Sequence, residues 1–284
     1  GIINAKQWQG KELSFNNILD LESAYQCCRE FQDPSCVIVK HLNPCGTATA
    51  EKLSEAFLRA RSGDPVSCFG GIVALNQKVD KQTALLMAET FFEGIIAPDY
   101  DEDALEVFKG KKNLRIMSLS NFDNRQGDLD YRRVEGGFLV QDADNECVDL
   151  ASCEVVTDRK PTEQELKDLN FAWKIVKHVK SNAIVFAKDA QSVGVGAGQM
   201  SRVDSVKIAA RKAVESFKDE SILQGAVMAS DAFFPFRDGV DAAAKTGIKA
   251  IVQPGGSVRD KEVIEACNEN GITMICTKMR HFRH

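Results

Sequence analysis

Short apolar runs alternate with amphipathic segments along the chain, and this alternation predicts a layered α/β fold. In the first half we expect strands at 36–40, 71–75, 94–98 and 114–119, and helices at 80–92 and 104–108. The second half repeats this order, with strands at 183–188, 225–230, 250–254 and 272–276, and helices at 240–245 and 260–267. The repeat predicts two similar lobes from an internal duplication, each with a mainly parallel sheet.

The length of the chain supports two lobes. Its 284 residues exceed the size at which a single core usually stays undivided. We place the first lobe at 1–125 and the second at 161–284, with an irregular polar linker at 126–160 that contains one apolar stretch, 137–140. The second lobe is expected to open on a helix, because Thr162 and Glu165 have the spacing of a capping box.

Composition narrows the class of protein. A hydrophobic content of 44% and a charged content of 27% are ordinary for a globular protein, and a net charge of -5 argues against a general binder of nucleic acid. Nine cysteines without a CxxC pair fit a reducing compartment, so we expect a cytoplasmic protein. No apolar run is long enough to span a membrane. Because the chain starts at Gly1 without an initiator Met, we expect it to be a segment of something longer.

The first candidate site is the pair Lys40 and His41, where the apolar run 36–39 meets the turn-forming segment 43–46. Residues just past a buried strand project into the crevice that the sheet presents. An imidazole can take a proton from a weak amine nucleophile, and a neighbouring ammonium can stabilise an oxyanion or hold a phosphate. The dipeptide alone is weak evidence and fits a solvated strand end better, since charge at the end of an element is ordinary.

A second group of polar residues precedes and follows the strand expected at 183–188. Asn182 could bind a polar heterocycle, or it could bond its own backbone in an Asx turn. The run Gly194–Arg202 contains GxGxG, which permits close backbone approach, and Arg202 could clamp a phosphate or carboxylate. The spacing does not match the dinucleotide-binding fingerprint.

The run 230–238, SDAFFPFRD, is the least ordinary in the chain. Its three aromatic residues either wedge the lobes together or stack on a flat ring, while Asp231 and Asp238 offer acceptors at its two ends. Phe69, next to Gly70, occupies the corresponding place in the first half. Both aromatic elements are therefore expected near one crevice.

Two further segments carry possible anion sites. Pro254–Ser257 leads into a helix, with Ser257 and Asp260 spaced for capping, so this helix start either binds an anion or is capped by its own side chains. The basic and aromatic tail 278–284 is either frayed or lets Arg280 reach a phosphate. A zinc site is not expected, because the run from His41 to Cys45 lacks the HxE and PCxxC pattern of zinc deaminases.

The chain resembles the AICAR transformylase family, a domain of bifunctional purine biosynthesis proteins. The resemblance spans essentially the whole chain and rests on VKHLNPCG, CFGGIVAL, EGIIAPDY, KSNAIVFAK, GVGAGQMSR, SDAFFPFRD, QPGGSVRD and MRHFRH. It implies two cytidine-deaminase-like three-layer α/β/α lobes and a homodimer with sites at the subunit interface. The implied reaction transfers the formyl group of 10-formyltetrahydrofolate to the amino group of AICAR, giving FAICAR on the path to IMP.

Roles follow from the resemblance, position by position. By this resemblance, His41 corresponds to the family's proton acceptor, and Lys40 corresponds to the residue that stabilises the transition state. Implied nucleotide contacts are Gly70, Glu93, Asn182, Arg202, Phe233 and Arg280, with Phe69 beside them; implied folate contacts are Val203, Asp238, Ser257 and Val258. The resemblance also allows a potassium ion near Ser181 and Asp231.

The chain departs from this family in its N-terminal part. It starts after the family's Arg-Tyr-Gly nucleotide motif and contains no IMP cyclohydrolase domain. An alternative hypothesis is therefore a truncated, weakly active or non-catalytic module that binds nucleotide or folate and dimerises. A metal-dependent deaminase is disfavoured because the zinc ligands are missing.

Overall fold

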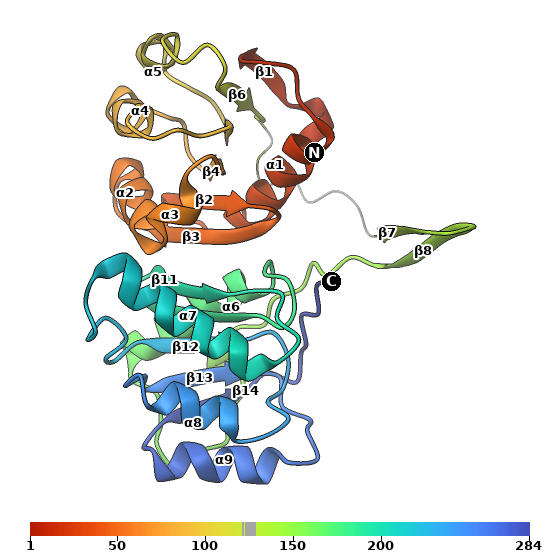
Figure 1. Ribbon diagram of the computed structural model, residues 1–284, viewed down its shortest axis with the longest axis vertical. Coiled ribbons are helices and arrows are strands. Elements are labelled where there is room, and N and C mark those ends of the chain that lie inside the picture. Colours follow the sequence, from red (N-terminus) through yellow and green to blue (C-terminus); the bar gives the residue numbers. More distant parts are fainter. Residues whose placement is uncertain (121, 123–128) are drawn as a thin grey trace.

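The computed structural model describes residues 1–120, 122 and 129–284, which form an α/β protein around one twelve-stranded sheet (Figure 1). The strand order is β1-β6-β5-β4-β2-β3-β11-β10-β12-β13-β14-β9. The first six strands in this order come from the first half of the chain, and the last six from the second. The two halves are joined where β3 and β11 pair in antiparallel fashion, with Gln191 opposite Ala48.

The first half begins with a short 3-10 helix, Ile2–Asn4. Its strands are β1 (Lys6–Gln9), β2 (Ser35–Lys40), β3 (Asn43–Thr49), β4 (Ile72–Leu75), β5 (Gly94–Ala97) and β6 (Arg115–Ser118). Its helices are α1 (Phe15–Cys28), α2 (Leu53–Gly63), α3 (Pro65–Cys68), α4 (Lys81–Ala88) and α5 (Glu102–Phe108).

The second half repeats this order of elements after a 3-10 helix at Leu150–Ser152. Its strands are β9 (Glu154–Val155), β10 (Ile184–Lys188), β11 (Gln191–Gly196), β12 (Val227–Ser230), β13 (Ala250–Gln253) and β14 (Thr273–Cys276). Its helices are α6 (Glu163–Val176), α7 (Arg202–Phe217), α8 (Asp238–Ala244) and α9 (Asp260–Glu269). The capping box predicted at Thr162 and Glu165 is confirmed at the start of α6.

The prediction of a mainly parallel sheet in each half is wrong. Strands β4, β5 and β6 are parallel to one another, as are β12, β13 and β14, but β2 and β10 run antiparallel to both of their neighbours. The physical reason is the two-residue connection from β2 to β3 and from β10 to β11, since such a short turn can join only antiparallel strands.

The helices cover both faces of the sheet and complete three layers. One continuous apolar cluster lies under α1 and α6 and includes residues of both halves, among them Val39, Trp173 and Val185. Two separate clusters lie on the opposite face, one under α2, α4 and α5 and the other under α7, α8 and α9. Successive strand residues point to opposite faces, which explains why Ile38 and Val39 belong to different clusters.

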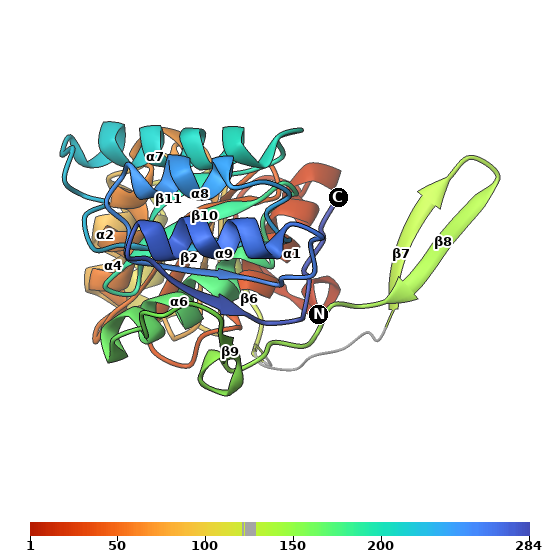
Figure 2. The same cartoon turned by 90° about the horizontal axis from the view of Figure 1, so that it is seen from below.

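The segment predicted to be an irregular linker contains more regular structure than expected. A hairpin of β7 (Leu129–Val134) and β8 (Gly137–Asp142) projects from the body of the protein (Figure 2). Its two-residue turn consists of Glu135 and Gly136, and the apolar stretch 137–140 noted in the sequence lies in β8. Gly136, with φ +83°, is the residue that signals the turn. The boundary placed at 125–126 lies outside the described residues, so it stays a prediction.

Two further expectations concern the whole chain. All nine cysteines, each of which is described, are free. Within the part of the chain that the structure covers, no helix has both the length and the apolar character needed to cross a membrane.

Candidate active site

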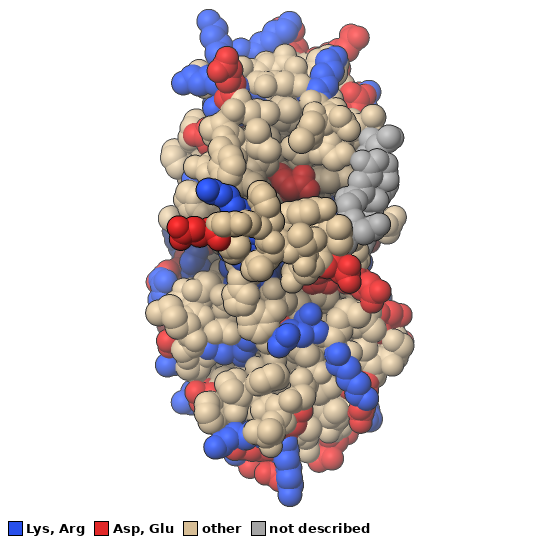
Figure 3. All heavy atoms as spheres, turned by 90° about the vertical axis from the view of Figure 1, so that its right-hand side faces the viewer, with Lys and Arg blue, Asp and Glu red and all other residues tan. Residues whose placement is uncertain are grey.

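The sheet topology brings most of the predicted site residues to one end of the sheet, which we call the Lys40 end. Strands β2, β12, β13 and β14 finish at this end, whereas β4, β5 and β10 begin there. A hydrogen bond of 2.9 Å from the backbone N–H of Lys180 to Oδ1 of Asn43 ties the two halves together there. Figure 3 views the side of the molecule on which the C-terminal tail lies, where acidic and basic side chains are interspersed.

Lys40 is held by backbone carbonyl groups of the loop before β4. Its Nζ donates to the carbonyl oxygens of Phe69, at 3.2 Å, and Gly70, at 2.9 Å. Gly70 has φ +68°, and a Cβ atom at this position would lie 3.1 Å from Nζ of Lys40. Glycine is therefore needed both for the backbone conformation and for the close approach of the ammonium. Within residues 1–120, 122 and 129–284, no carboxylate forms an ion pair with this ammonium.

His41 lies in the two-residue turn between β2 and β3. Both turn residues have left-handed backbone conformations, with φ 51° at His41 and φ 67° at Leu42. The His41 side chain is exposed. The turn is held from α1, because the N–H of Leu42 donates to Oδ1 of Asp20 at 2.7 Å and the Ser23 hydroxyl donates to the carbonyl of Leu42 at 2.8 Å.

The loop that holds Lys40 carries an aromatic pair and lies next to an ion pair. Phe69 is 62% exposed, and its ring centroid lies 5.4 Å from that of Phe91. The N–H of Gly70 donates to the carbonyl of Phe91 at 2.8 Å, which fixes this loop. Glu93, just before β5, forms an ion pair of 2.8 Å with Arg115. One carboxylate oxygen of Glu93 is therefore engaged by Arg115, the first residue of β6.

In the second half, the buried Arg202 and Asp231 form a polar centre with the half-buried Asn182. Arg202 donates to the hydroxyl of Ser230 and to Oδ1 of Asn182, both at 2.8 Å, and to the carboxylate of Asp231. The amide of Asn182 donates in turn to the carbonyl oxygens of Gln199, at 2.8 Å, and Met200, at 3.1 Å. Asn182 therefore fixes the Gly-rich loop, and the interpretation as a simple Asx turn is wrong.

The aromatic run divides between the core and the surface. Phe234 is fully buried in the core of the second half, and its N–H donates to Oε1 of Gln253 at 2.9 Å. It does not wedge the halves together. Phe233 is half-buried, and Phe236 is exposed under the guanidinium of Arg259, 4.8 Å from the ring centroid.

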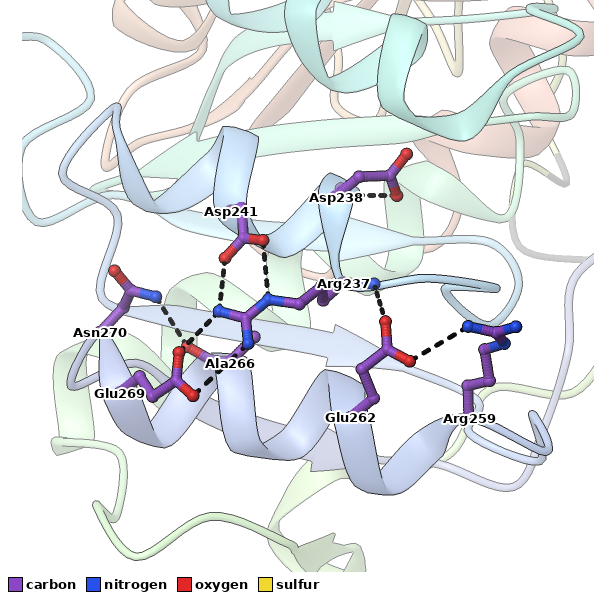
Figure 4. Close-up of polar contacts among 9 residues, drawn as sticks. Arg237, Asp238, Asp241, Arg259, Glu262, Ala266, Glu269 and Asn270 are labelled. Carbon is purple, nitrogen blue, oxygen red and sulfur yellow. Dashed lines mark hydrogen bonds and ion pairs between the residues drawn. The ribbon is translucent and has the colours of Figure 1, made fainter.

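A network of ion pairs fixes this run to α9 (Figure 4). Arg237 bonds Asp241 through two nitrogens, at 2.8 and 3.0 Å, and reaches Glu269 at 2.6 Å. Glu262 accepts from the N–H of Arg237 at 3.4 Å and from Arg259 at 3.3 Å. The network connects the start of α8, where Asp238 lies, with the loop of Ser257 and Val258. All three residues are predicted folate contacts.

The predicted folate contacts themselves lie on the surface. Asp238 and Val258 are exposed, whereas Ser257 and Val203 are half-buried. Both residues expected to cap this helix start bond backbone N–H groups: the Ser257 hydroxyl accepts from Arg259 at 3.1 Å, and Asp260 accepts from Ser257, at 3.1 Å, and Gly256, at 2.6 Å. Helix α9 begins at Asp260, as predicted.

The C-terminal tail is held along the Lys40 end and is not frayed. The N–H of His281 donates to the carbonyl of Asp231 at 3.1 Å, and the N–H of Ser181 donates to the carbonyl of Arg283 at 2.8 Å. The buried His281 ring lies 2.7 Å from Asp144 and packs 4.8 Å from the Trp173 ring. Arg280 is exposed and stacks over Phe282, at 5.0 Å from the centroid.

A cavity of about 250 Å³ opens between this tail and the Gly-rich loop. Its lining residues are Ser181, Asn182, Gly198, Gln199, Met200, Phe282 and His284. It therefore lies directly against Asn182 and on the same side of the molecule as the exposed Arg280.

A buried ionic cluster connects the two halves behind the tail. Glu30 lies 3.3 Å from Nζ of Lys177 and 3.2 Å from Nε2 of His178, and Arg283 approaches Nδ1 of His178 at 3.4 Å. Burial lowers the pKa of His178 to about 4, against the partial opposition of Glu30. The contacts agree with a neutral imidazole, which donates to Glu30 and accepts from Arg283.

The predicted residues thus form two groups at one end of the sheet. Lys40, Phe69 and Gly70 are in direct contact in the first half, and Asn182 contacts Arg202 in the second. Glu93, Phe233 and Arg280 lie in separate loops. Of the predicted folate contacts, Val203 and Asp238 lie in the first turns of α7 and α8, and Ser257 and Val258 lie in the loop before α9. The sequence carries no signal for Asp20, Ser23 or Asn43. These side chains bond backbone groups of distant residues, and such contacts leave no distinctive spacing in the sequence.

The residues at Asp231 do not call for a cation. One oxygen of the carboxylate is balanced by the guanidinium of Arg202, and the other accepts from the hydroxyl of Ser181. Among the residues that the structure describes, no group of three His, Cys, Asp or Glu side chains could hold a metal ion. The potassium ion therefore stays a prediction, and no chemical step below depends on it.

Comparisons with known proteins agree with these motifs. The profile of the AICARFT/IMPCHase bienzyme family matches residues 1–212. Three relatives are called bifunctional purine biosynthesis protein PurH, and they come from Magnetococcus marinus, Persephonella marina and Aquifex aeolicus. They are 56%, 55% and 54% identical to this chain and cover 100%, 97% and 100% of it. The matches take in 54%, 53% and 55% of the relatives, so the chain spans about half their length.

Proposed function

Because the chain belongs to the AICARFT/IMPCHase bienzyme family, we propose that it transfers a formyl group from 10-formyltetrahydrofolate to the 5-amino group of AICAR. The observation that carries the proposal is the ammonium of Lys40, held by two carbonyl groups beside His41, at the same end of the sheet as the Asn182 and Arg202 centre. An ammonium that is held by carbonyl groups, with no carboxylate partner among the residues that the structure covers, can stabilise a developing oxyanion.

The chemistry divides between the two residues as follows. The amine of AICAR attacks the formyl carbon, and the imidazole of His41 takes the proton that the amine loses. The ammonium of Lys40 stabilises the oxyanion of the tetrahedral intermediate. The bond from the formyl carbon to N10 of the folate then breaks, and the proton passes to N10, which gives FAICAR and tetrahydrofolate. The poor nucleophilicity of the amine makes its orientation important.

Substrate positions follow from the surroundings of the two groups. The cavity lined by Asn182 and Phe282 would take the nucleotide, with Arg280 at its phosphate and Phe69, Gly70, Glu93, Arg202 and Phe233 as the remaining predicted contacts. Arg202 commits three of its five N–H donors to Asn182, Ser230 and Asp231, so it contributes mainly by fixing the Asn182 loop. The folate would lie over Val203, Asp238, Ser257 and Val258.

The finer architecture belongs to the same proposal. The strand order and the helix order of the two halves support two cytidine-deaminase-like units from a duplication, with the division at 1–125, 126–160 and 161–284. A cytoplasmic homodimer with sites at the subunit interface is proposed from the family resemblance alone.

Replacement of His41 tests the proposal. We expect His41→Ala to lower turnover by about 10² to 10⁴, the range for loss of a general base, while binding of AICAR is retained. Formyl transfer is followed by the absorbance change that accompanies release of tetrahydrofolate. The matched control is Asp189→Ala, since Asp189 is also exposed and occupies a two-residue turn with φ 52° in the second half.

Three outcomes are distinct. Loss of turnover in His41→Ala but not in Asp189→Ala supports the proposal. Equal turnover of the wild-type protein and His41→Ala removes His41 from the mechanism. Binding of AICAR or folate without any formyl transfer by the wild-type protein would indicate the non-catalytic binding module instead.

A further inference from the structure

The turn that carries His41 has a conformation that its residues do not favour. A two-residue turn with φ above zero at both positions usually contains Asn and Gly. Here the positions are His41, with φ 51°, and Leu42, with φ 67°. A left-handed conformation costs about 1 to 2 kcal/mol at each residue with a side chain. Contacts from outside the turn are therefore needed to hold it.

Helix α1 supplies those contacts. Oδ1 of Asp20 accepts from the N–H of Leu42 at 2.7 Å, and the hydroxyl of the buried Ser23 donates to the carbonyl of the same residue at 2.8 Å. Both backbone groups of Leu42 are thus bonded to one rigid helix. Because His41 precedes Leu42 directly, the direction of its side chain depends on this attachment.

The second half contains the same arrangement without an imidazole. The turn from β10 to β11 has φ 52° at Asp189 and φ 55° at Ala190, and both N–H groups donate to Asp168, at 3.1 and 2.8 Å. Asp168 is the sixth residue of α6, as Asp20 is the sixth residue of α1. Both helices have 14 residues and start with a capping box, at Ser14 and Thr162.

We infer that Asp20, supported by Ser23, is a positioning residue that fixes His41 for proton transfer, and that Asp168 is its non-catalytic counterpart. This inference rests on the proposed function for the role of His41. It extends that function to a residue that acts only through the backbone of Leu42. An aspartate at this position of the helix stabilises a strained turn in both halves, but only in the first half does the turn carry an imidazole.

The test compares Asp20→Ala with Asp168→Ala in the 284-residue protein. We expect Asp20→Ala to lower kcat by about 10- to 100-fold with less than about a twofold change in KM for AICAR, as a misplaced catalytic group would. Asp168→Ala should leave kcat within about twofold of the wild-type value. Both single variants should lower the melting temperature, and by similar amounts. Asp20→Asn, which keeps an acceptor for the N–H of Leu42, should retain most of the kcat.

Combination with His41→Ala separates positioning from general destabilisation. If Asp20 acts only through His41, Asp20→Ala adds no further loss of kcat in the His41→Ala background. Equal kcat values for Asp20→Ala and Asp168→Ala would overturn the inference, and so would a full additional loss in the double variant. Failure of the proposed function has a different result, namely that His41→Ala retains the wild-type kcat.

Hydrogen exchange tests the structural part without any turnover. Asp20→Ala should accelerate exchange of the Leu42 amide and leave the Ala190 amide unchanged, and Asp168→Ala should do the reverse. Unchanged protection of Leu42 in Asp20→Ala would show that the turn does not depend on Asp20.

Discussion

The buried pair of Arg202 and Asp231 gives the sharpest prediction about stability. Their side chains are 6% and 0% exposed, and the pair connects the start of α7 with the residue that follows β12. Replacement of Arg202 by Met leaves the Asp231 carboxylate buried, with the hydroxyl of Ser181 as its one remaining side-chain partner among the described residues. It also leaves Oδ1 of Asn182 and the Ser230 hydroxyl without the guanidinium.

The expected cost follows from the burial of the charge that remains. Breaking a buried ion pair by removal of one partner costs about 3 to 5 kcal/mol, because the other charge is left uncompensated. In a large domain, a loss of 1 kcal/mol lowers the melting temperature by roughly 2 to 4 °C, so Arg202→Met should lower it by roughly 6 to 20 °C. The double variant with Asp231→Asn removes both charges and should recover about half of this loss or more.

Urea and thermal unfolding of the wild-type protein, the two single variants and the double variant provide the measurement. A coupling energy of about 1 kcal/mol or more is expected from this cycle, since residues in one network are not additive. The reasoning would be refuted by a cost below about 1 kcal/mol for Arg202→Met together with additive effects in the double variant, since both charges would then be solvated.

The remaining predictions concern the loop that holds Lys40 and the buried imidazole. Gly70→Ala should lower kcat by about tenfold, because the new Cβ would lie 3.1 Å from Nζ of Lys40 at a position with φ +68°. The control Gly225→Ala, with φ +76° and open space around the new Cβ, should lose only the stability that backbone strain costs, about 1 to 2 kcal/mol. Equal kcat values for the two variants would contradict this reasoning. The pKa of His178 falls from 6.5 to about 4 on folding, so the unfolded chain binds more protons between these values. Stability should therefore decrease as the pH falls from about 6.5 to about 4, by about 3 kcal/mol at most, and thermal unfolding from pH 7 to 5 should show a shallower decrease in His178→Gln.

The sequence by itself determined the kinds of element and their repetition. Strand positions at 36–40 and 183–188 and the capping box at Thr162 follow from local periodicity and local hydrogen bonding, which need no distant partner. The motif around Lys40 and His41 likewise indicated a candidate site, and the quoted motifs in combination indicated the family. These are properties of short segments, so they can be recognised in the sequence.

Only the tertiary structure decided which strands pair and what each polar side chain contacts. The single sheet arises because β3 and β11 meet across the two halves, and nothing local specifies that contact. The same holds for Lys40 with the carbonyl of Gly70, for Arg202 with Asp231, and for Asp20 with Leu42. Each contact joins residues that are distant in sequence, and it forms because packing of the sheet and helices brings their elements together.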